Sequence, residues 1–136
     1  MKPISALLTA CLSSALAAGC TNSFQTQIPT GESMKGTWTG TSSGHEEGKN
    51  TGTNATLLIN KAAGQTFSGT ISYKYTDGRS GKETIHGSIG KNGTIVIADN
   101  DGFYINGSLD NKKLYLQYIE ASPEESEASN VFFEKK

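Results

Sequence analysis

From residue 35 to residue 134, apolar and polar residues alternate with a period of two. Gly, Asn and Asp interrupt this alternation at intervals of roughly 8 to 12 residues, the spacing of turns in small β-proteins. Successive side chains of a strand point to opposite faces, so the alternation predicts short strands that each bury one face. The pattern favours a small all-β sandwich or barrel and argues against a helical bundle.

The alternation predicts about eight strands. Four connections, at residues 62–65, 91–93, 100–102 and 110–112, contain Gly, Asn or Asp, which tolerate positive φ, so the strands they join should pair as antiparallel hairpins. Joining the first strand to the last would remove both exposed edges of the sheet. We therefore expect a small antiparallel up-and-down β-barrel, with strands at residues 36–42, 53–61, 66–75, 82–90, 94–98, 103–109, 113–119 and 128–134.

Alternation also predicts which side chains face the barrel interior. Five glycines, at positions 36, 40, 69, 87 and 107, fall in phase with these inward residues. They either permit the tight coiling of a narrow barrel or leave room for a ligand, and both interpretations stay open. The predicted interior comprises Trp38, Leu57, Ile59, Phe67, Ile71, Tyr73, Ile85, Ile89, Ile95, Ile97, Phe103, Ile105, Leu114, Leu116, Tyr118, Val131 and Phe133.

The first 19 residues have the character of a secretory signal peptide, with one cation at Lys2 followed by an apolar stretch. This stretch is shorter than the roughly 20 residues that a membrane-spanning helix needs. The following residues 20–34 are polar, contain Pro29 and Gly31, and are predicted to be a tether. We expect three parts: a signal peptide at 1–19, a modified cysteine and tether at 20–34, and a barrel domain at 35–136.

The segment Leu-Ala-Ala-Gly-Cys at residues 16–20 resembles the lipobox of bacterial lipoproteins. The resemblance implies cleavage before Cys20, acylation of its thiol and anchoring of the protein in a membrane. Thr21 at the next position implies the outer membrane, facing the periplasm or the cell surface. Cys11 would leave with the signal, so the mature chain would have no thiol for a disulfide.

Residues that could support catalysis or metal binding are sparse. His45 lies in a polar segment, residues 43–52, that we expect to be a flexible loop, and His86 is expected on the outer face. Asp99-Asn100-Asp101-Gly102 begins like a calcium loop but lacks the acidic residue at the twelfth position, so a hairpin turn is predicted. No Gly-x-Ser-x-Gly motif is present. We therefore expect no catalytic residue, no metal site and no cofactor, and we expect that the protein is not an enzyme.

Trp38 lies in Gly-Thr-Trp-Thr-Gly at residues 36–40, which resembles the opening strand of lipocalin-like and avidin-like barrels. Further motifs at 66–70, 87–90, 101–104 and 116–120 resemble uncharacterised small secreted proteins of proteobacteria. The resemblance implies a barrel whose first-strand tryptophan closes one end of the core. A net charge of -1 argues against a surface that binds nucleic acid.

Three functions remain open. The leading expectation is a non-enzymatic, lipid-anchored binding module for another envelope protein or polymer, contacted through outward-facing Tyr75, Tyr104, Tyr115 and Phe132. The second is a carrier of a small apolar ligand inside the barrel, which a cavity reaching Trp38 would favour. The third is an inhibitor or immunity-type lipoprotein that acts through loops 43–52 and 120–129. The residues expected to contact a carried ligand are Trp38, Phe67, Tyr73, Phe103 and Tyr118.

Overall fold

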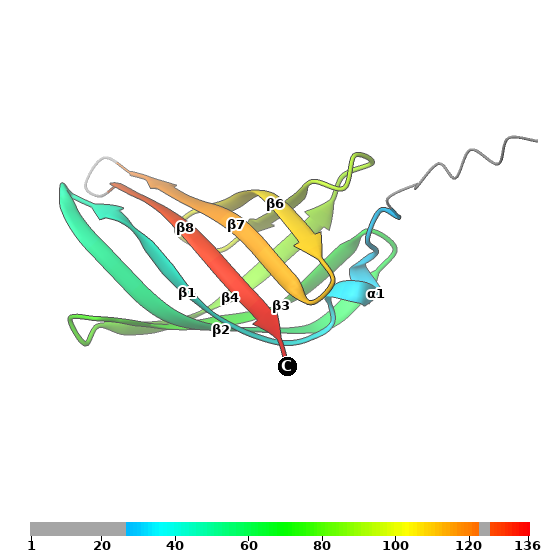
Figure 1. The fold of residues 1–136 in the computed structure, drawn as a ribbon, viewed down its shortest axis with the longest axis horizontal. Coiled ribbons are helices and arrows are strands. Elements are labelled where there is room, and N and C mark those ends of the chain that lie inside the picture. Colours follow the sequence, from blue (N-terminus) through cyan, green and yellow to red (C-terminus); the bar gives the residue numbers. More distant parts are fainter. Residues whose placement is uncertain (1–26, 123–125) are drawn as a thin grey trace, which may run out of the picture.

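In the part of the chain that the structure describes, eight antiparallel strands form a closed barrel in chain order, preceded by one short helix (Figure 1). The structure, a computed structural model, describes residues 27–122 and 126–136. It confirms the predicted up-and-down barrel. None of its described helices is both long and apolar enough to cross a membrane. The elements are α1 (Gly31–Met34), β1 (Gly36–Glu46), β2 (Lys49–Ala63), β3 (Thr66–Tyr75), β4 (Ser80–Ile89), β5 (Ile95–Ala98), β6 (Phe103–Asp110), β7 (Lys113–Ala121) and β8 (Ser126–Lys135).

The first and last strands close the barrel. β1 pairs with β8 in an antiparallel register that runs from Trp38 opposite Lys135 to Glu46 opposite Glu127. β1 also pairs with β2 along its whole length, so neither β1 nor β8 presents an open edge. This closure satisfies the backbone groups that an open sheet of the same strands would expose.

The prediction of a flexible loop at residues 43–52 is wrong, because β1 and β2 continue through this segment and are joined by a two-residue turn. Glu47 and Gly48 form the turn with φ values of 48° and 77°. Positive φ at both central residues is the geometry of tight hairpin turns that match the twist of paired strands. The segment is polar on both faces, so the period-two pattern is not visible in its sequence although its backbone pairs throughout.

β6 reverses its inward face partway along its length. The pairing of β6 with β7 shifts register between Ile105 and Ser108, and Asn106 has a φ of 52°. Such a bulge adds one residue to one strand and inverts the alternation that follows it. Tyr104 is therefore inside and only 7% exposed, whereas Phe103 is outside and 57% exposed. The inward placement expected for Phe103 and Ile105, and the outward placement expected for Tyr104, are wrong.

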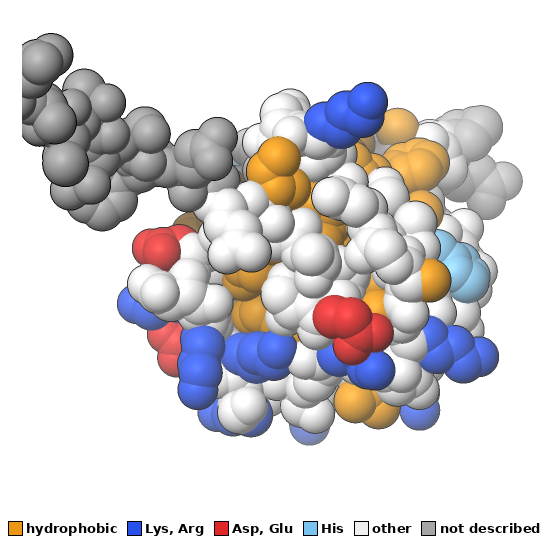
Figure 2. Space-filling view, turned by 90° about the vertical axis from the view of Figure 1, so that its right-hand side faces the viewer, with side chains coloured by type: hydrophobic (Ala, Val, Ile, Leu, Met, Phe, Trp, Pro, Cys, Tyr) orange, Lys and Arg blue, Asp and Glu red, His pale blue; other side chains and the backbone are white. Residues whose placement is uncertain are grey.

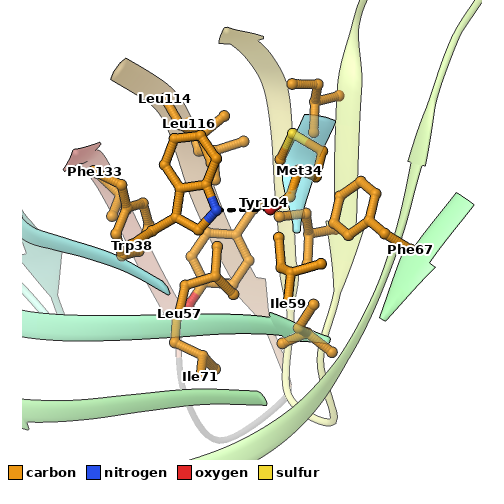
Figure 3. Packing of buried hydrophobic residues seen from close by; sticks show 14 of the residues in the cluster. Met34, Trp38, Leu57, Ile59, Phe67, Ile71, Tyr104, Leu114, Leu116 and Phe133 are labelled. Carbon is orange, nitrogen blue, oxygen red and sulfur yellow. Dashed lines mark hydrogen bonds between the residues drawn. The ribbon is translucent and has the colours of Figure 1, made fainter. Parts of the chain in front are cut away.

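The short helix α1 covers one end of the barrel (Figures 1 and 3). Met34 and Trp38 are both fully buried, and the indole Nε1 of Trp38 donates a hydrogen bond of 2.8 Å to the carbonyl oxygen of Met34. The backbone N–H of Gly31 donates to the carbonyl of Gly64 at 2.9 Å. The last four residues of the predicted tether thus belong to the folded domain. We call this end, with α1 and Trp38, the closed end.

The inward glycines allow close packing rather than opening a cavity. A Cβ atom at Gly87 would collide with the ring of Phe67, and one at Gly69 would collide with the backbone carbonyl of Leu58. The space that their missing side chains leave is already filled by these neighbours. Of the two interpretations that the sequence left open, tight coiling of the barrel is the one that these contacts support.

Candidate ligand-binding site

A cavity opens at the end of the barrel opposite α1, which we call the mouth. About 50 Å³ of it can hold the centres of water-sized molecules, within a space of about 490 Å³ that includes open solvent. Toward the closed end, the space among Leu57, Ile85, Leu116 and their neighbours is too small for a water molecule. The barrel is thus filled in one half and hollow in the other. The cavity is lined by Ser42, Thr53, Ala55, Ile71, Tyr73, Tyr75, Glu83, Asp99, Asp101, Tyr104, Tyr118, Glu120, Glu127, Ser129 and Val131.

Four tyrosine rings form much of the cavity wall, in two pairs. Tyr73 and Tyr75, both on β3, meet edge to face with their ring centroids 5.6 Å apart. Tyr104 on β6 and Tyr118 on β7 are cross-strand neighbours with centroids 4.7 Å apart. β3 is separated from β6 by β4 and β5 on one side of the barrel and from β7 by β2, β1 and β8 on the other. The two pairs therefore belong to opposing walls.

Three of these tyrosine hydroxyls donate hydrogen bonds to carboxylates at the mouth. Tyr73 donates to Glu83 at 2.8 Å, and Tyr118 donates to Glu120 at 3.3 Å. Tyr75 donates at 3.1 Å to Glu127, which also accepts a bond of 2.8 Å from the hydroxyl of Ser129. These bonds bring each carboxylate against an aromatic ring at the cavity edge.

The electrostatics of the mouth disfavour negative charge. Burial, followed by the neighbouring carboxylates, raises the pKa of Tyr73, Tyr75 and Tyr118 well above the usual value, so their hydroxyls stay protonated and donate. Burial also raises the pKa of Glu83 and of Asp99 above their ordinary values, and nearby acidic groups add to both shifts. The protein thus holds several carboxyls where their ionised forms lack full solvation.

Arg79 lies at the rim of the mouth, outside the cavity lining. Its guanidinium donates to both carboxylate oxygens of Glu46, at 2.9 and 2.7 Å, and to Asp77 at 2.7 Å. The same group lies 4.3 Å from the ring centroid of Tyr75. The hydrogen bonds from Arg79 lower the pKa of Asp77. Arg79 thus neutralises Glu46 and Asp77, which lie outside the cavity lining.

The two ends of the barrel differ in charge. Figure 2 looks onto the closed end, where Lys side chains are spread around the rim. A groove at this end is lined by Lys112, Lys113 and Lys135 together with Asp110 and Glu134. The carboxylates of the cavity lie at the opposite end. The small net charge of the chain therefore conceals a basic closed end and an acidic mouth.

The structure brings together only two of the residues predicted to contact a ligand. Tyr73 and Tyr118 line the cavity, whereas Trp38 and Phe67 pack in the filled half and Phe103 lies on the outer surface. The cavity thus does not reach Trp38, the condition that we set for the carrier hypothesis. Cys20, the predicted lipidation site, lies outside the described residues.

Of the four rings predicted to face outward, only two do so. Tyr115 and Phe132 are cross-strand neighbours on the outer surface, with ring centroids 4.8 Å apart. Tyr75 and Tyr104 instead line the cavity, so their predicted outward placement is wrong. Tyr75 has the same alternation phase as Tyr73, which places both inside.

Sequence reasoning missed the carboxylates of the cavity, although a signal for them exists. Glu83 precedes Ile85 in the inward phase of β4, Asp99 follows Ile97 of β5 in the same way, and Glu127 begins the inward series of β8. An acidic residue in phase with buried aliphatic residues marks the polar part of an interior face. The expected turn at Asp99 is confirmed, since its Oδ1 accepts bonds from two backbone N–H groups at 3.1 and 2.6 Å.

Comparison with known proteins shows the fold. No protein-family model and no curated protein sequence matches the chain. The structure of an S-type phycobiliprotein lyase from Guillardia theta is similar, with a TM-score of 0.58 and 9% identity over 77% of this chain and 89% of that chain. A de novo designed fluorescence-activating β-barrel is similar with a TM-score of 0.54 and 12% identity over 78% and 96% of the two chains. These likenesses support a lipocalin-like barrel.

The same comparison corrects the expectation that the chain is not an enzyme. That expectation rested on the lack of a hydrolase motif, yet a protein with a similar barrel is a lyase. A barrel of this kind is compatible with catalysis that needs no such motif, and the sequence argument does not exclude an enzyme.

Proposed function

We propose that the protein binds a small molecule in the hollow half of its barrel. The observation that carries the proposal is the cavity at the mouth, into which four tyrosines and several carboxylates converge. Concave sites with aromatic walls and a few placed polar groups are typical of small-molecule binding. The similar barrels, a phycobiliprotein lyase and a designed fluorescence-activating protein, support this choice over binding of an envelope partner through outer rings.

Nuclear magnetic resonance with a set of small soluble fragments tests this function. In spectra of ¹⁵N-labelled barrel domain, we expect binding fragments to shift the backbone amides of Tyr73, Glu83 and Tyr118. The indole N–H of Trp38 should be unaffected, because the filled half separates it from the cavity. If no fragment shifts the mouth amides, or if shifts gather around Phe132, the proposed site is wrong.

Two matched variants separate binding inside the barrel from binding at its surface. Tyr118→Ser removes a ring from the cavity wall, and Phe132→Ser removes a ring that is 56% exposed on the outer surface of the adjacent strand. Some fragments shift the signals of the mouth amides, and we expect only Tyr118→Ser to lower their affinity. The expected loss is about tenfold, which corresponds to about 1.4 kcal/mol of binding free energy. If Phe132→Ser lowered their affinity by the same factor, the proposal would be contradicted.

We also propose that Cys20 carries a lipid and holds the barrel at a membrane of the cell envelope. The support is the lipobox-like segment at residues 16–20. Two or more acyl chains on one cysteine suffice for durable anchoring. The described chain enters the barrel through α1 at the closed end, opposite the mouth (Figure 1).

The anchor predicts a specific chemical modification. Mass spectrometry of the protein purified from native membranes should find an N-terminal peptide that begins at an acylated Cys20. The variant Cys20→Ser should lose membrane partition, while Cys11→Ser should keep it, since Cys11 leaves with the signal. Detection of an unmodified Cys20 thiol in the membrane-purified protein would count against the anchor.

A further inference from the structure

We propose that the ligand of the mouth cavity is a small organic cation, an ammonium group attached to a short apolar body. The inference rests on the proposed function and specifies the chemical class of its ligand. It is carried by the charge of the cavity lining, by a buried carboxylate oxygen left unpartnered in the cavity wall and by the arrangement of the tyrosine rings.

The charge of the lining has one sign. Among the described residues, the cavity lining includes no Lys, Arg or His, but it includes five carboxylates. Low-dielectric walls strengthen the field of such a group of charges and attract ligands of opposite charge. An anionic ligand would be repelled for the same reason. The five carboxylates belong to Glu83, Asp99, Asp101, Glu120 and Glu127.

Three of these carboxylates accept hydrogen bonds from neutral groups. Glu83 accepts from the Tyr73 hydroxyl, Asp99 accepts from backbone N–H groups, and Glu127 accepts from two hydroxyls. Neutral donors leave the negative charge itself in place. A ligand that brings a positive charge would provide a stronger, charge-assisted contact to the same oxygens.

One buried polar atom in the cavity wall lacks a hydrogen-bond partner. The Oε2 atom of Glu83 is buried and accepts no hydrogen bond from the described residues. Leaving a buried polar atom unsatisfied costs free energy, so a ligand that supplies the missing contact gains affinity. Glu83 belongs to the cavity lining.

The tyrosine rings suit an ammonium group in particular. The face of an aromatic ring carries partial negative charge and attracts cations within about 6 Å of its centroid. The pair Tyr73–Tyr75 and the pair Tyr104–Tyr118 lie on opposing walls, so a cation between them would meet rings on both sides. At the rim, the guanidinium of Arg79 already makes such a contact with Tyr75 at 4.3 Å.

The geometry favours an organic cation over a bare metal ion. No group of three or more His, Cys, Asp or Glu side chains in residues 27–122 and 126–136 is placed to hold a metal. The carboxylates are instead distributed around the mouth on β4, β7, β8 and the segment between β5 and β6. Below them, the floor is apolar at Ala55, Ile71 and Val131. A charged head near the mouth with a short apolar body toward the floor fits both parts.

Three isosteric probes isolate the charge of the ligand. Choline is a permanent cation, 3,3-dimethylbutan-1-ol replaces its nitrogen by carbon without charge, and 3,3-dimethylbutanoate has a similar body with a negative charge. Titration of the barrel domain, followed by calorimetry and by the mouth amides, should give binding of choline that is at least about tenfold tighter than that of the alcohol. The butanoate should not shift the mouth amides.

A matched pair of variants assigns the charge effect to the mouth. Glu83→Gln removes a charge from the lining but keeps an oxygen that accepts from Tyr73, and Glu134→Gln makes the same change at the closed end, where Glu134 is 71% exposed. We expect Glu83→Gln to lower the affinity for choline by about five- to tenfold. It should have only a small effect on the affinity for the neutral alcohol, and Glu134→Gln should leave the affinities for both probes unchanged.

The outcomes separate this inference from the function on which it rests. If the alcohol binds as tightly as choline, or if Glu83→Gln leaves the affinity for choline unchanged, the proposal of a cationic ligand is refuted. The proposal that the cavity binds a small molecule is not affected by these results. The same holds if fragments shift the mouth amides but choline at 10 mM, an excess of about tenfold over a millimolar dissociation constant, does not. If neither the fragments nor choline reach the mouth, both proposals fail.

Discussion

Replacing Trp38 with alanine should lower the free energy of unfolding by about 3–5 kcal/mol, the range for truncating a large buried aromatic residue. Trp38 is fully buried and contributes to the packing of the closed end (Figure 3). Its indole also provides the hydrogen bond that fixes the carbonyl of Met34 at the end of α1. The variant therefore leaves a cavity and an unpaired carbonyl together. Urea denaturation followed by circular dichroism measures the loss.

Two control variants divide this effect into its parts. Trp38→Phe keeps most of the ring but removes the donor to Met34, which should cost about 1–3 kcal/mol. Phe132→Ala removes an aromatic ring that is 56% exposed and should change stability by no more than about 0.5 kcal/mol. A loss below about 1 kcal/mol for Trp38→Ala would show that Trp38 does not hold the closed end together.

The barrel could be predicted from the sequence because its determinants are local. Alternation marks each strand, and Gly, Asn and Asp mark the turns that fix which strands are neighbours. Two features escaped this reasoning. The bulge near Asn106 depends on how β6 fits its partner strands, and the extension of β1 and β2 to Glu47 and Gly48 depends on pairing between two polar segments. Both are set by contacts between strands rather than by the pattern within one.

The site was harder to predict because aromatic residues serve two purposes in this barrel. Trp38 and Phe67 were expected at the ligand but pack the closed end, where α1 covers them. Tyr73 and Tyr118 occupy the mouth, and their hydroxyls reach carboxylates there. The inward faces of the strands become solvated toward the mouth, so acidic residues in the inward phase are tolerated there. A sequence reader who expects apolar residues throughout an inward face does not consider such acids as candidates for an interior site.

The pH dependence of the ligand-free protein should reveal the same carboxyls. Burial raises the pKa of Glu83 and Asp99 in the folded state above their ordinary values of 4.5 and 3.8. Between the unfolded and folded values the native state binds more protons, so the contribution of these groups to stability falls as pH rises through that window. Asp77 has the opposite effect on the pH dependence of stability. Because Arg79 lowers the pKa of Asp77, the contribution of Asp77 to stability is lost as the pH falls.

The double variant Glu83→Gln/Asp99→Asn should remove this contribution and raise the melting temperature at neutral pH. The control Glu134→Gln/Asp110→Asn at the closed end should not. Melting curves across pH measure both. The titratable and charged groups that surround the two carboxyls are Tyr73 and Tyr75 on β3, Asp101, Tyr104 on β6, Tyr118 and Glu120 on β7, Glu127 on β8, and Glu46, Asp77 and Arg79 at the rim.

The affinity for choline should change in the opposite direction from stability. Choline does not titrate, so its binding should weaken as acid protonates Glu83 and Asp99, and it should weaken by about 30- to 100-fold in the double variant if two charge contacts are lost. A protein that becomes more stable while losing its ligand has given up charges that only the ligand needed. A double variant that kept choline affinity, or kept the acid dependence of binding, would show that these two carboxyls do not hold the cation.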